Sequence, residues 1–172
     1  MMQGLYDLLL YLALPFALLR LLWRSRRLPA YRERWGERLG AYDSADLKAM
    51  VWIHAVSVGE VRSLKSLIGQ LGGQGHRIVL SVTTPAGLEF ARREYQSIAV
   101  IDAPLDFSFV IRRFIRRLNP RLVIFNELEI WPNWITLLHR KRIPIMLING
   151  RISEAAFARY RFFNFILQPF FR

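Results

Sequence analysis

With 172 residues, the chain is long enough for one domain with a sizeable core and too short for two full α/β domains. Hydrophobic residues make up 53% and charged residues 22%, which excludes an intrinsically disordered chain, and the lack of cysteine excludes disulfides and thiolate metal sites. The formal net charge of +12 favours a polyanionic partner: nucleic acid, an anionic membrane surface or a phosphorylated substrate.

The N-terminal segment Leu5–Trp23 is apolar and about long enough to cross the roughly 30 Å hydrocarbon core of a bilayer. Its charged residues Asp7 and Arg20 lie near the ends, where each can reach an interface. The arginines that follow are Arg24, Arg26, Arg27, Arg32, Arg34 and Arg38. Their position excludes a cleaved signal peptide and predicts a cytoplasmic location for the globular part. We expect a membrane-anchoring helix over residues 1–27, which either spans the bilayer or, because of Pro15, lies in its interface; a buried core helix is the third alternative.

After a basic, turn-rich connecting segment (residues 28–50), short apolar runs alternate with amphipathic ones. The apolar runs are rich in Val and Ile, which is typical of buried strands. The predicted strands are Val51–Val56, Arg77–Val82, Ile98–Ile101, Leu122–Phe125 and Pro144–Ile148. The predicted helices are Glu60–Leu71, Ala86–Tyr95, Asp106–Leu118 and Trp131–Lys141. This alternation predicts an α/β fold over residues 51–172: a Rossmann-like parallel sheet with helices on both faces.

The predicted helix Asp106–Leu118 has one apolar face and one basic face, and Asp106 is its expected N-cap. The apolar positions are Phe107, Val110, Ile111, Phe114, Ile115 and Leu118. The basic positions are Arg112, Arg113, Arg116 and Arg117. The basic face is either simply solvated or helps to hold the domain against anionic lipid, and one helix can do both.

In an open parallel sheet, ligands bind where the carboxyl ends of the strands meet the following loops. The loop after the first strand contains Ser57, Gly59 and Glu60 and runs into a helix, whose N-terminus offers free N–H groups. Glu60 suits a general base for a sugar hydroxyl, or it only complements the helix dipole. After the second strand, Thr84 either contacts a sugar hydroxyl or caps the next helix, with Pro85 at its first position.

Two further loops carry charged side chains. Glu127 and Glu129 follow the fourth strand and point the same way if the strand continues, which predicts a pair of acidic groups. So many polar groups at a buried strand end are costly unless they are satisfied or used. After the fifth strand, Arg151 stands beside a glycine and is able to bind phosphate or carboxylate. The chain has no Walker A, GxGxxG or GxSxG motif and no histidines paired at ligand spacing, so we expect no nucleotide hydrolysis, dinucleotide binding, α/β-hydrolase mechanism or metal site.

Taken in order, five segments resemble the N-terminal half of the 3-deoxy-D-manno-octulosonic acid (Kdo) transferases, a family of lipid A glycosyltransferases. The segments are Ala30–Arg38, His54–Glu60, Thr84–Gly87, Glu127–Asn133 and Asn149–Ser153. The resemblance covers almost the whole chain, including the expected anchor. Leu128 is a small departure, because threonine is expected between the two glutamates.

This resemblance implies the acceptor-binding half of a GT-B glycosyltransferase, in which two Rossmann-like domains enclose the active site. Such an enzyme transfers Kdo from CMP-Kdo to the lipid A precursor (lipid IVA) with inversion, without a bound metal or cofactor, at the bacterial inner membrane. It implies Glu60 as the general base. The expected acceptor-binding or supporting residues are Ser57, Gly59, Thr84, Glu127, Glu129 and Arg151. Because the chain ends at Arg172, roughly where the donor domain would begin, we expect that domain to be absent and the chain alone to be inactive.

The expected partners are the lipid A precursor and anionic membrane lipids, and two rival functions remain. A non-catalytic membrane or lipid A-binding module of the same fold would keep its binding without Glu60. A nucleic-acid-binding protein would suit the charge of +12 and would bind in a salt-dependent manner. The apolar N-terminus and the lack of a recognised nucleic-acid module make this the weakest alternative, so we expect no nucleic acid partner.

Overall fold

The computed structural model describes residues 2–25, 35–42, 51–129, 131–151, 157 and 161, and its five strands form one sheet. The strands are β1 (Val51–Ala55), β2 (Ile78–Val82), β3 (Ala99–Asp102), β4 (Leu122–Asn126) and β5 (Ile145–Ile148). Their order in the sheet is β3-β2-β1-β4-β5, and every neighbouring pair is parallel. The predicted strands and the parallel sheet are confirmed, with boundaries that agree to within one residue.

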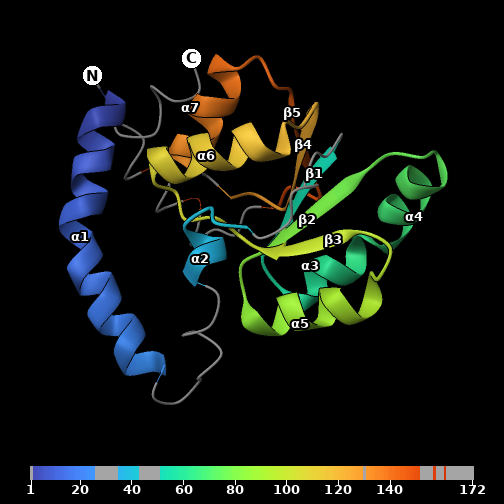
Figure 1. Cartoon of the computed structure of the whole chain (residues 1–172), viewed down its shortest axis with the longest axis horizontal. Helices are drawn as coiled ribbons and strands as arrows, with labels where there is room; N and C mark the ends of the chain where they lie inside the picture. The colour runs from blue at the N-terminus through green and yellow to red at the C-terminus, as the bar shows by residue number, and fades with distance from the viewer. Residues whose placement is uncertain are drawn as a thin grey trace.

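Helices cover both faces of the sheet, as the alternation in the sequence predicted. The helices within the described residues are α1 (Met2–Ser25), α2 (Trp35–Arg38), α3 (Val58–Ser63), α4 (Lys65–Gly73), α5 (Pro85–Glu94), α6 (Ser108–Leu118) and α7 (Pro132–Arg140). Figure 1 shows α6 and α7 on one side of the sheet and α3 and α5 on the other. Successive side chains of a strand point to opposite faces, so each strand contributes to two separate cores.

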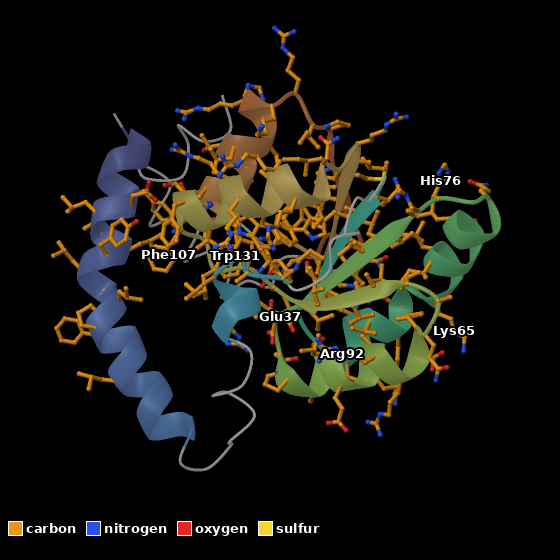
Figure 2. All side chains as sticks on the ribbon, in the orientation of Figure 1. Glu37, Lys65, His76, Arg92, Phe107 and Trp131 are labelled. Atoms are coloured by element: carbon orange, nitrogen blue, oxygen red, sulfur yellow. The ribbon has the colours of Figure 1, made fainter. Side chains whose placement is uncertain are left out.

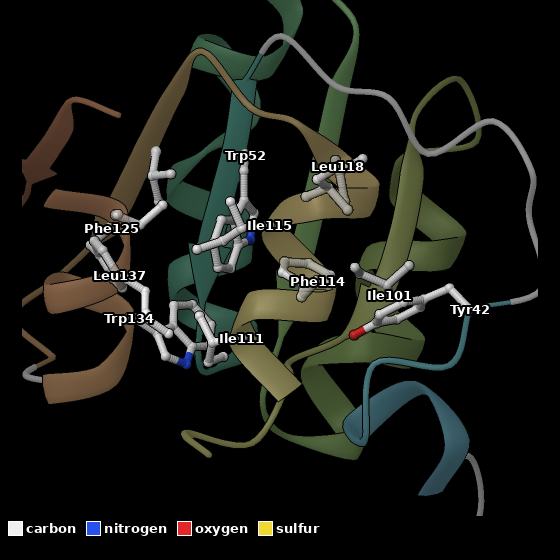
Figure 3. Packing of buried hydrophobic residues seen from close by; sticks show 13 residues of the cluster. Tyr42, Trp52, Ile101, Ile111, Phe114, Ile115, Leu118, Phe125, Trp134 and Leu137 are labelled. Carbon is white, nitrogen blue, oxygen red and sulfur yellow. The ribbon is translucent and has the colours of Figure 1, made fainter. Parts of the chain in front are cut away.

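The core under α6 and α7 is built around aromatic rings (Figure 3). Trp52 is fully buried, with its ring centroid 4.6 Å from that of Phe114 and 4.6 Å from that of Trp134. Such tilted and edge-on pairs add to the free energy that the burial of their large apolar surface contributes. The opposite core contains the aliphatic residues of β1 and β2 together with Val61 and Leu88 from the helices.

Helix α6 matches its predicted amphipathic pattern, but its predicted cap is wrong. The residues predicted on its apolar face are buried and its four arginines are exposed. Asp106 does not cap α6, whose N-cap residue is Phe107 and has no side-chain hydrogen bond. Instead, Asp106 accepts hydrogen bonds from the backbone N–H groups of Asn133 (3.3 Å) and Trp134 (3.1 Å) in the first turn of α7. These N–H groups have no intrahelical acceptor, and tertiary packing brings them to Asp106.

The single helix predicted over Glu60–Leu71 is divided into α3 and α4 at Leu64. The backbone carbonyl of Glu60 accepts hydrogen bonds from Ser63 Oγ (2.8 Å) and Asn126 Nδ2 (3.0 Å). The N–H of Leu64 therefore bonds to the carbonyl of Val61 at 3.3 Å, three residues back. A side chain that takes a helix carbonyl in this way competes with the α-helical ladder, so the helix breaks here.

Helix α1 stands beside α6 and α7 (Figure 1). Tyr6 Oη donates to Asp106 Oδ2 (2.8 Å), and Asn133 Nδ2 donates to Asp7 Oδ1 (2.8 Å). The Tyr11 ring lies 5.4 Å from that of Phe107, which Figure 2 places next to α1. Asp7 is thus bonded to the domain, although the sequence suggested that it reaches a membrane interface.

No helix within the described residues is both long enough and apolar enough to cross a membrane. The structure therefore does not support the spanning form of the expected anchoring helix.

The basic segment 28–50 is described only for residues 35–42. Arg38 is buried and pairs with Asp102 at 3.1 Å, so this arginine is not part of a membrane-facing cluster. Glu37 accepts from the N–H of Asp102 (3.0 Å) and pairs with Arg92 at 3.4 Å (Figure 2). These contacts attach α2 to the carboxyl end of β3. The other arginines predicted in this segment, Arg32 and Arg34, lie outside the described residues.

Candidate active site

The site lies where the order of the strands reverses. From β1 the chain proceeds to β2 and β3 on one side, and β4 and β5 lie on the other side of β1. In open parallel sheets such a switch point leaves a crevice at the carboxyl ends of the two central strands. The two loops that border it are the turn from β1 into α3, with Ser57 to Glu60, and the loop after β4, with Glu127 to Trp131.

Ser57 and Glu60 form reciprocal caps at the start of α3. Ser57 Oγ accepts from the N–H of Glu60 (3.4 Å), and Glu60 Oε2 accepts from the N–H of Val56 (2.9 Å). This pairing resembles the capping box that closes many helix N-termini. The N–H of Val56 therefore holds one carboxylate oxygen of Glu60, and the Ser57 side chain also hydrogen-bonds the carboxyl group.

The carboxyl group of Glu60 has a raised affinity for protons. Its residue is only 7% exposed, and this burial is the largest cause of its raised pKa. The donors at Val56 and Ser57 act in the opposite direction, while the negative charges of Glu127 and Glu129 add to the increase. Burial without a cationic partner disfavours the ionised form, which makes the carboxylate a stronger base when it is ionised.

Strand β4 does not continue through Glu127 and Glu129. The assumption that led us to predict side chains pointing the same way is therefore wrong. Strand β4 ends at Asn126, and Glu127 has a left-handed backbone with φ of 69°. Glu127 is exposed, and its N–H bonds to the carbonyl of Ile148 (2.9 Å). Both carboxylates still lie near enough to Glu60 to raise its pKa, which makes the loop an acidic border of the crevice.

Glu129 has an environment different from that of Glu60. Its Oε2 accepts hydrogen bonds from His54 Nε2 (3.0 Å) and Trp131 Nε1 (2.8 Å). Burial acts to raise the pKa of Glu129, but its attraction to His54 and these two hydrogen bonds outweigh burial and hold the pKa below its ordinary value. Glu129 therefore stays ionised at neutral pH.

Thr84 caps α5, which is one of the two roles predicted for this residue. Its Oγ1 donates to the carbonyl of Val56 (2.6 Å) and accepts from the N–H of Gly87 (3.3 Å), and Pro85 occupies the first turn. The hydroxyl group thereby joins the loop after β2 to the loop that carries Ser57. Gly59 is exposed, and a Cβ atom there would meet only Ser57 Oγ at 3.8 Å, so space remains above the backbone.

Arg151 is not joined to this network. It is exposed, and the described part of the chain supplies it with no hydrogen bond or ion pair. Its loop begins next to the site, because Asn149 Nδ2 donates to Asn126 Oδ1 (2.8 Å) at the end of β4. Elsewhere, no three histidine, aspartate or glutamate side chains of the described residues converge as a metal ion would require.

Comparison with known proteins identifies the family. A family model described as 3-deoxy-D-manno-octulosonic-acid transferase (kdotransferase) matches residues 33–172. The 3-deoxy-D-manno-octulosonic acid transferase of Haemophilus influenzae is 36% identical over 160 residues, covering 90% of this chain and 38% of that protein. The enzyme of the same name from Chlamydia pneumoniae is 30% identical over 172 residues, covering 96% of this chain and 39% of that protein. The chain belongs to the Kdo transferase family.

The resemblance inferred from the five segments is therefore confirmed. The chain spans less than two fifths of the Haemophilus influenzae Kdo transferase, at 38% of its length. It also matches a bifunctional glycosyltransferase/methyltransferase of Fusobacterium nucleatum, which is 32% identical over 160 residues that cover 86% of this chain and 25% of that protein. The matched residues 33–172 include the whole sheet and both loops of the candidate site of this Kdo transferase family member.

Sequence reasoning missed two polar residues of the site, His54 and Asn126. His54 is 1% exposed in β1, and Asn126 is 1% exposed at the end of β4. Asn126 Nδ2 also donates to Ser63 Oγ (3.0 Å), so it joins β4 to α3. For His54 the signal was present, because a polar residue inside a predicted buried strand needs a hydrogen-bond partner. The hydrogen-bond partner itself could not be named without knowledge of how the strands pair.

Proposed function

We propose that the chain forms the acceptor side of an enzyme that transfers Kdo from CMP-Kdo to the lipid A precursor in lipopolysaccharide core biosynthesis. The proposal is supported by membership of the Kdo transferase family and by relatives named 3-deoxy-D-manno-octulosonic acid transferase. The donor nucleotide would be bound by the part of those relatives that lies beyond the matched residues. The crevice between β1 and β4 would receive the sugar end of the acceptor, since ligands of open parallel sheets bind at this position.

Glu60 would act as the general base of the transfer. The supporting observation is a buried carboxylate with one oxygen fixed by the N–H of Val56 and with a raised pKa. As the acceptor hydroxyl oxygen forms a bond to the anomeric carbon of Kdo, its proton would pass to Glu60. The bond between that carbon and the CMP phosphate oxygen breaks at the same time, and CMP leaves with the electron pair. One displacement of this kind inverts the anomeric centre, and we propose that it needs no bound metal.

The other predicted site residues would have supporting roles. The exposed Gly59 would allow the acceptor to approach the backbone beside Ser57, and the ionised Glu129 would accept a hydrogen bond from a sugar hydroxyl. The exposed Arg151 would pair with a phosphate group of the acceptor. Thr84 would act only through the loop that it holds, because its hydroxyl group is engaged with Val56 and Gly87.

Helix α1 and the basic face of α6 would hold the domain at the cytoplasmic face of the inner membrane. The outward side of α1 has an apolar stripe at helical spacing, and each of its residues is more than half exposed. The stripe consists of Leu8, Leu12, Phe16 and Leu19. Such a stripe suits a helix that lies in the membrane interface, and exposed arginines are attracted to anionic headgroups. Glutamine at both Leu12 and Phe16 should weaken flotation with phosphatidylglycerol vesicles, whereas Met146→Gln, an exposed apolar position in β5, should not. Equal flotation of all forms would contradict this role of α1.

The transfer itself is tested with Glu60→Gln. Glutamine keeps the size of the side chain and can still accept the hydrogen bond from Val56 N–H, so the cap of α3 remains while the base is lost. Kdo transfer from CMP-Kdo to lipid IVA would be measured in detergent, with the C-terminal part of a Kdo transferase supplied. We expect Glu60→Gln to lower the rate roughly 100- to 10,000-fold. Glu89→Gln, which removes the same charge from an exposed position of α5, should leave the rate unchanged.

Each outcome of this assay has a distinct meaning. Full activity of Glu60→Gln would contradict the base role. A folded wild-type protein that binds lipid IVA but transfers nothing would favour the non-catalytic lipid A-binding module. Transfer by the 172-residue chain alone would contradict the expectation that donor binding needs a further part.

A further inference from the structure

A line of hydrogen bonds runs through the core to the candidate site. Trp52 Nε1 donates to Ser81 Oγ (2.8 Å), and Ser81 Oγ lies 2.9 Å from His54 Nδ1. His54 Nε2 lies 3.0 Å from Glu129 Oε2. Trp52 and Ser81 are completely buried, and the line ends at Glu129, whose side chain is 25% exposed. The line therefore connects the interior of the sheet to the loop that borders the crevice.

The donors and acceptors in this line favour one arrangement of its hydrogens. The Trp52 indole can only donate, and the ionised Glu129 can only accept. Ser81 Oγ accepts from the indole and directs its own hydrogen to His54 Nδ1 at 2.9 Å, in preference to the carbonyl of Ile53 at 3.4 Å. His54 then carries its hydrogen on Nε2 and donates it to Glu129. Every bond points the same way, and bonds aligned in one direction strengthen one another.

The imidazole ring of His54 cannot turn away from this line. Its centroid lies 4.8 Å from that of Trp134 at an interplanar angle of 63°, and 5.9 Å from that of Phe125 at 75°. The parallel pairing of β1 with β2 places His54 directly beside Ser81. The position of Nε2, and with it the position of the carboxylate that it binds, is therefore set by the sheet and by the core under α7.

We propose that His54 is a positioning residue, which holds the Glu129 carboxylate in one orientation next to the loop that carries Glu60. The orientation of Glu129 stands on the geometry alone, and its benefit to transfer rests on the proposed function. A buried polar line costs free energy relative to apolar side chains of the same size, so it is expected where a group at its end has a use.

Two substitutions of His54 separate positioning from packing. His54→Gln places an amide N–H near the position of Nε2 and can keep the bond to Glu129. His54→Asn reaches only as far as Nδ1 and loses that bond. Both variants remove the ring from the core, so both lose the packing against Trp134 and Phe125. The difference between them reports the hydrogen bond to Glu129.

The measurement is a carboxyl-detected NMR titration of the 172-residue chain in detergent micelles. The ionisable groups that influence one another here are His54, Glu60, Glu127 and Glu129. In His54→Asn, the pKa of Glu129 should rise, because only the Trp131 hydrogen bond then offsets burial, and the pKa of Glu60 should fall as the neighbouring charge is weakened. In His54→Gln both values should stay close to those of the wild type. An unchanged Glu129 in His54→Asn would overturn the proposal.

A second measurement needs no substitution. The ¹⁵N chemical shifts of His54 in the wild-type chain should report a hydrogen on Nε2 throughout the pH range in which Glu129 is ionised. A hydrogen on Nδ1 alone would overturn the proposal even if neither variant folds. Both measurements are made without donor or acceptor, so they decide the role of His54 whatever the transfer assay gives. Conversely, a failed transfer assay leaves the expected titration intact.

Discussion

Gly87 is the position at which a single added methyl group should disturb the site most directly. A Cβ atom at Gly87 would lie 2.9 Å from Thr84 Oγ1, 2.9 Å from Val82 Cγ1 and 3.2 Å from the carbonyl carbon of Ser57. The two shortest distances are below those that real Cβ atoms show, and the third atom belongs to the backbone of the turn that leads to Glu60. Alanine at this position therefore requires α5 to move away from β2 and from that turn.

The size of the effect follows from a comparison with Gly69. Gly69 is exposed in α4, and a Cβ atom there would meet nothing within 4 Å. Gly69→Ala should raise the free energy of unfolding by about 0.5–1 kcal/mol, because alanine restricts the unfolded chain and favours the helix. Gly87→Ala receives a similar gain and also an overpacking cost of about 1–3 kcal/mol. The free energies of unfolding of the two variants should therefore differ by about 1–3 kcal/mol, with Gly87→Ala less stable.

Urea unfolding in mild detergent, followed by tryptophan fluorescence and by circular dichroism, measures this difference. Each kcal/mol corresponds to roughly 2–4 °C in melting temperature for a domain of this size, so a thermal scan gives an independent value. Equal stability of Gly87→Ala and Gly69→Ala would refute the close contact between α5 and the Ser57 turn. If Gly87→Ala is destabilised as expected, the capping bond between Glu60 and Val56 should also weaken, and the pKa of Glu60 should rise further, because this bond lowers it.

Three further predictions concern residues other than Glu60. Burial raises the pKa of Asp106 to about 7, above the value of an unfolded aspartate, so its contribution to the free energy of unfolding is full at low pH and is lost as the pH rises through 7. Between pH 4 and pH 8 the free energy of unfolding should fall by roughly 4 kcal/mol through this group. Asp106→Asn should remove that fall, measured by urea unfolding at each pH; an unchanged pH dependence would contradict the raised pKa. Asn126→Ala should cost about 1–3 kcal/mol in the same assay, because its two bonds to α3 are lost and their partners stay buried. Lys65→Ala should change the free energy of unfolding by less than about 0.5 kcal/mol despite the 2.7 Å ion pair with Glu94, because the lysine side chain is 75% exposed.

The strands and the faces of α6 could be predicted because their pattern is local. A strand buried on both faces is a short, continuous apolar run, and a half-buried helix repeats with its own period. The division between α3 and α4 could not be predicted in this way. It depends on Asn126, which takes the carbonyl of Glu60 from 66 positions further along the chain. The prediction that Asp106 caps α6 failed for the same reason, since its carboxylate serves a helix that the fold brings near.

The site was predictable in outline, because strand ends and the switch point follow from the order of the elements. Glu60 and Glu129 were found from their loops alone. The partner of Glu129 was not found, because His54 lies in the interior of β1 and its second partner, Ser81, lies in β2. Their contact requires the register of the two strands, in which His54 pairs with Ser81. A single sequence does not give that register.

The opposite pKa shifts of Glu60 and Glu129 assign different tasks to two carboxylates on the same crevice. Both are partly or fully buried, which by itself disfavours the ionised form of each. For Glu129, two side-chain donors and the attraction of His54 overcome this cost, so it keeps its negative charge and cannot readily accept a proton. For Glu60, the donors at Val56 and Ser57 do not overcome it, and the neighbouring carboxylates increase it. Environments that separate the pKa values of adjacent groups are typical of acid–base pairs, so in the proposed transfer the proton of the acceptor hydroxyl would pass to Glu60, with Glu129 as a fixed charge beside it.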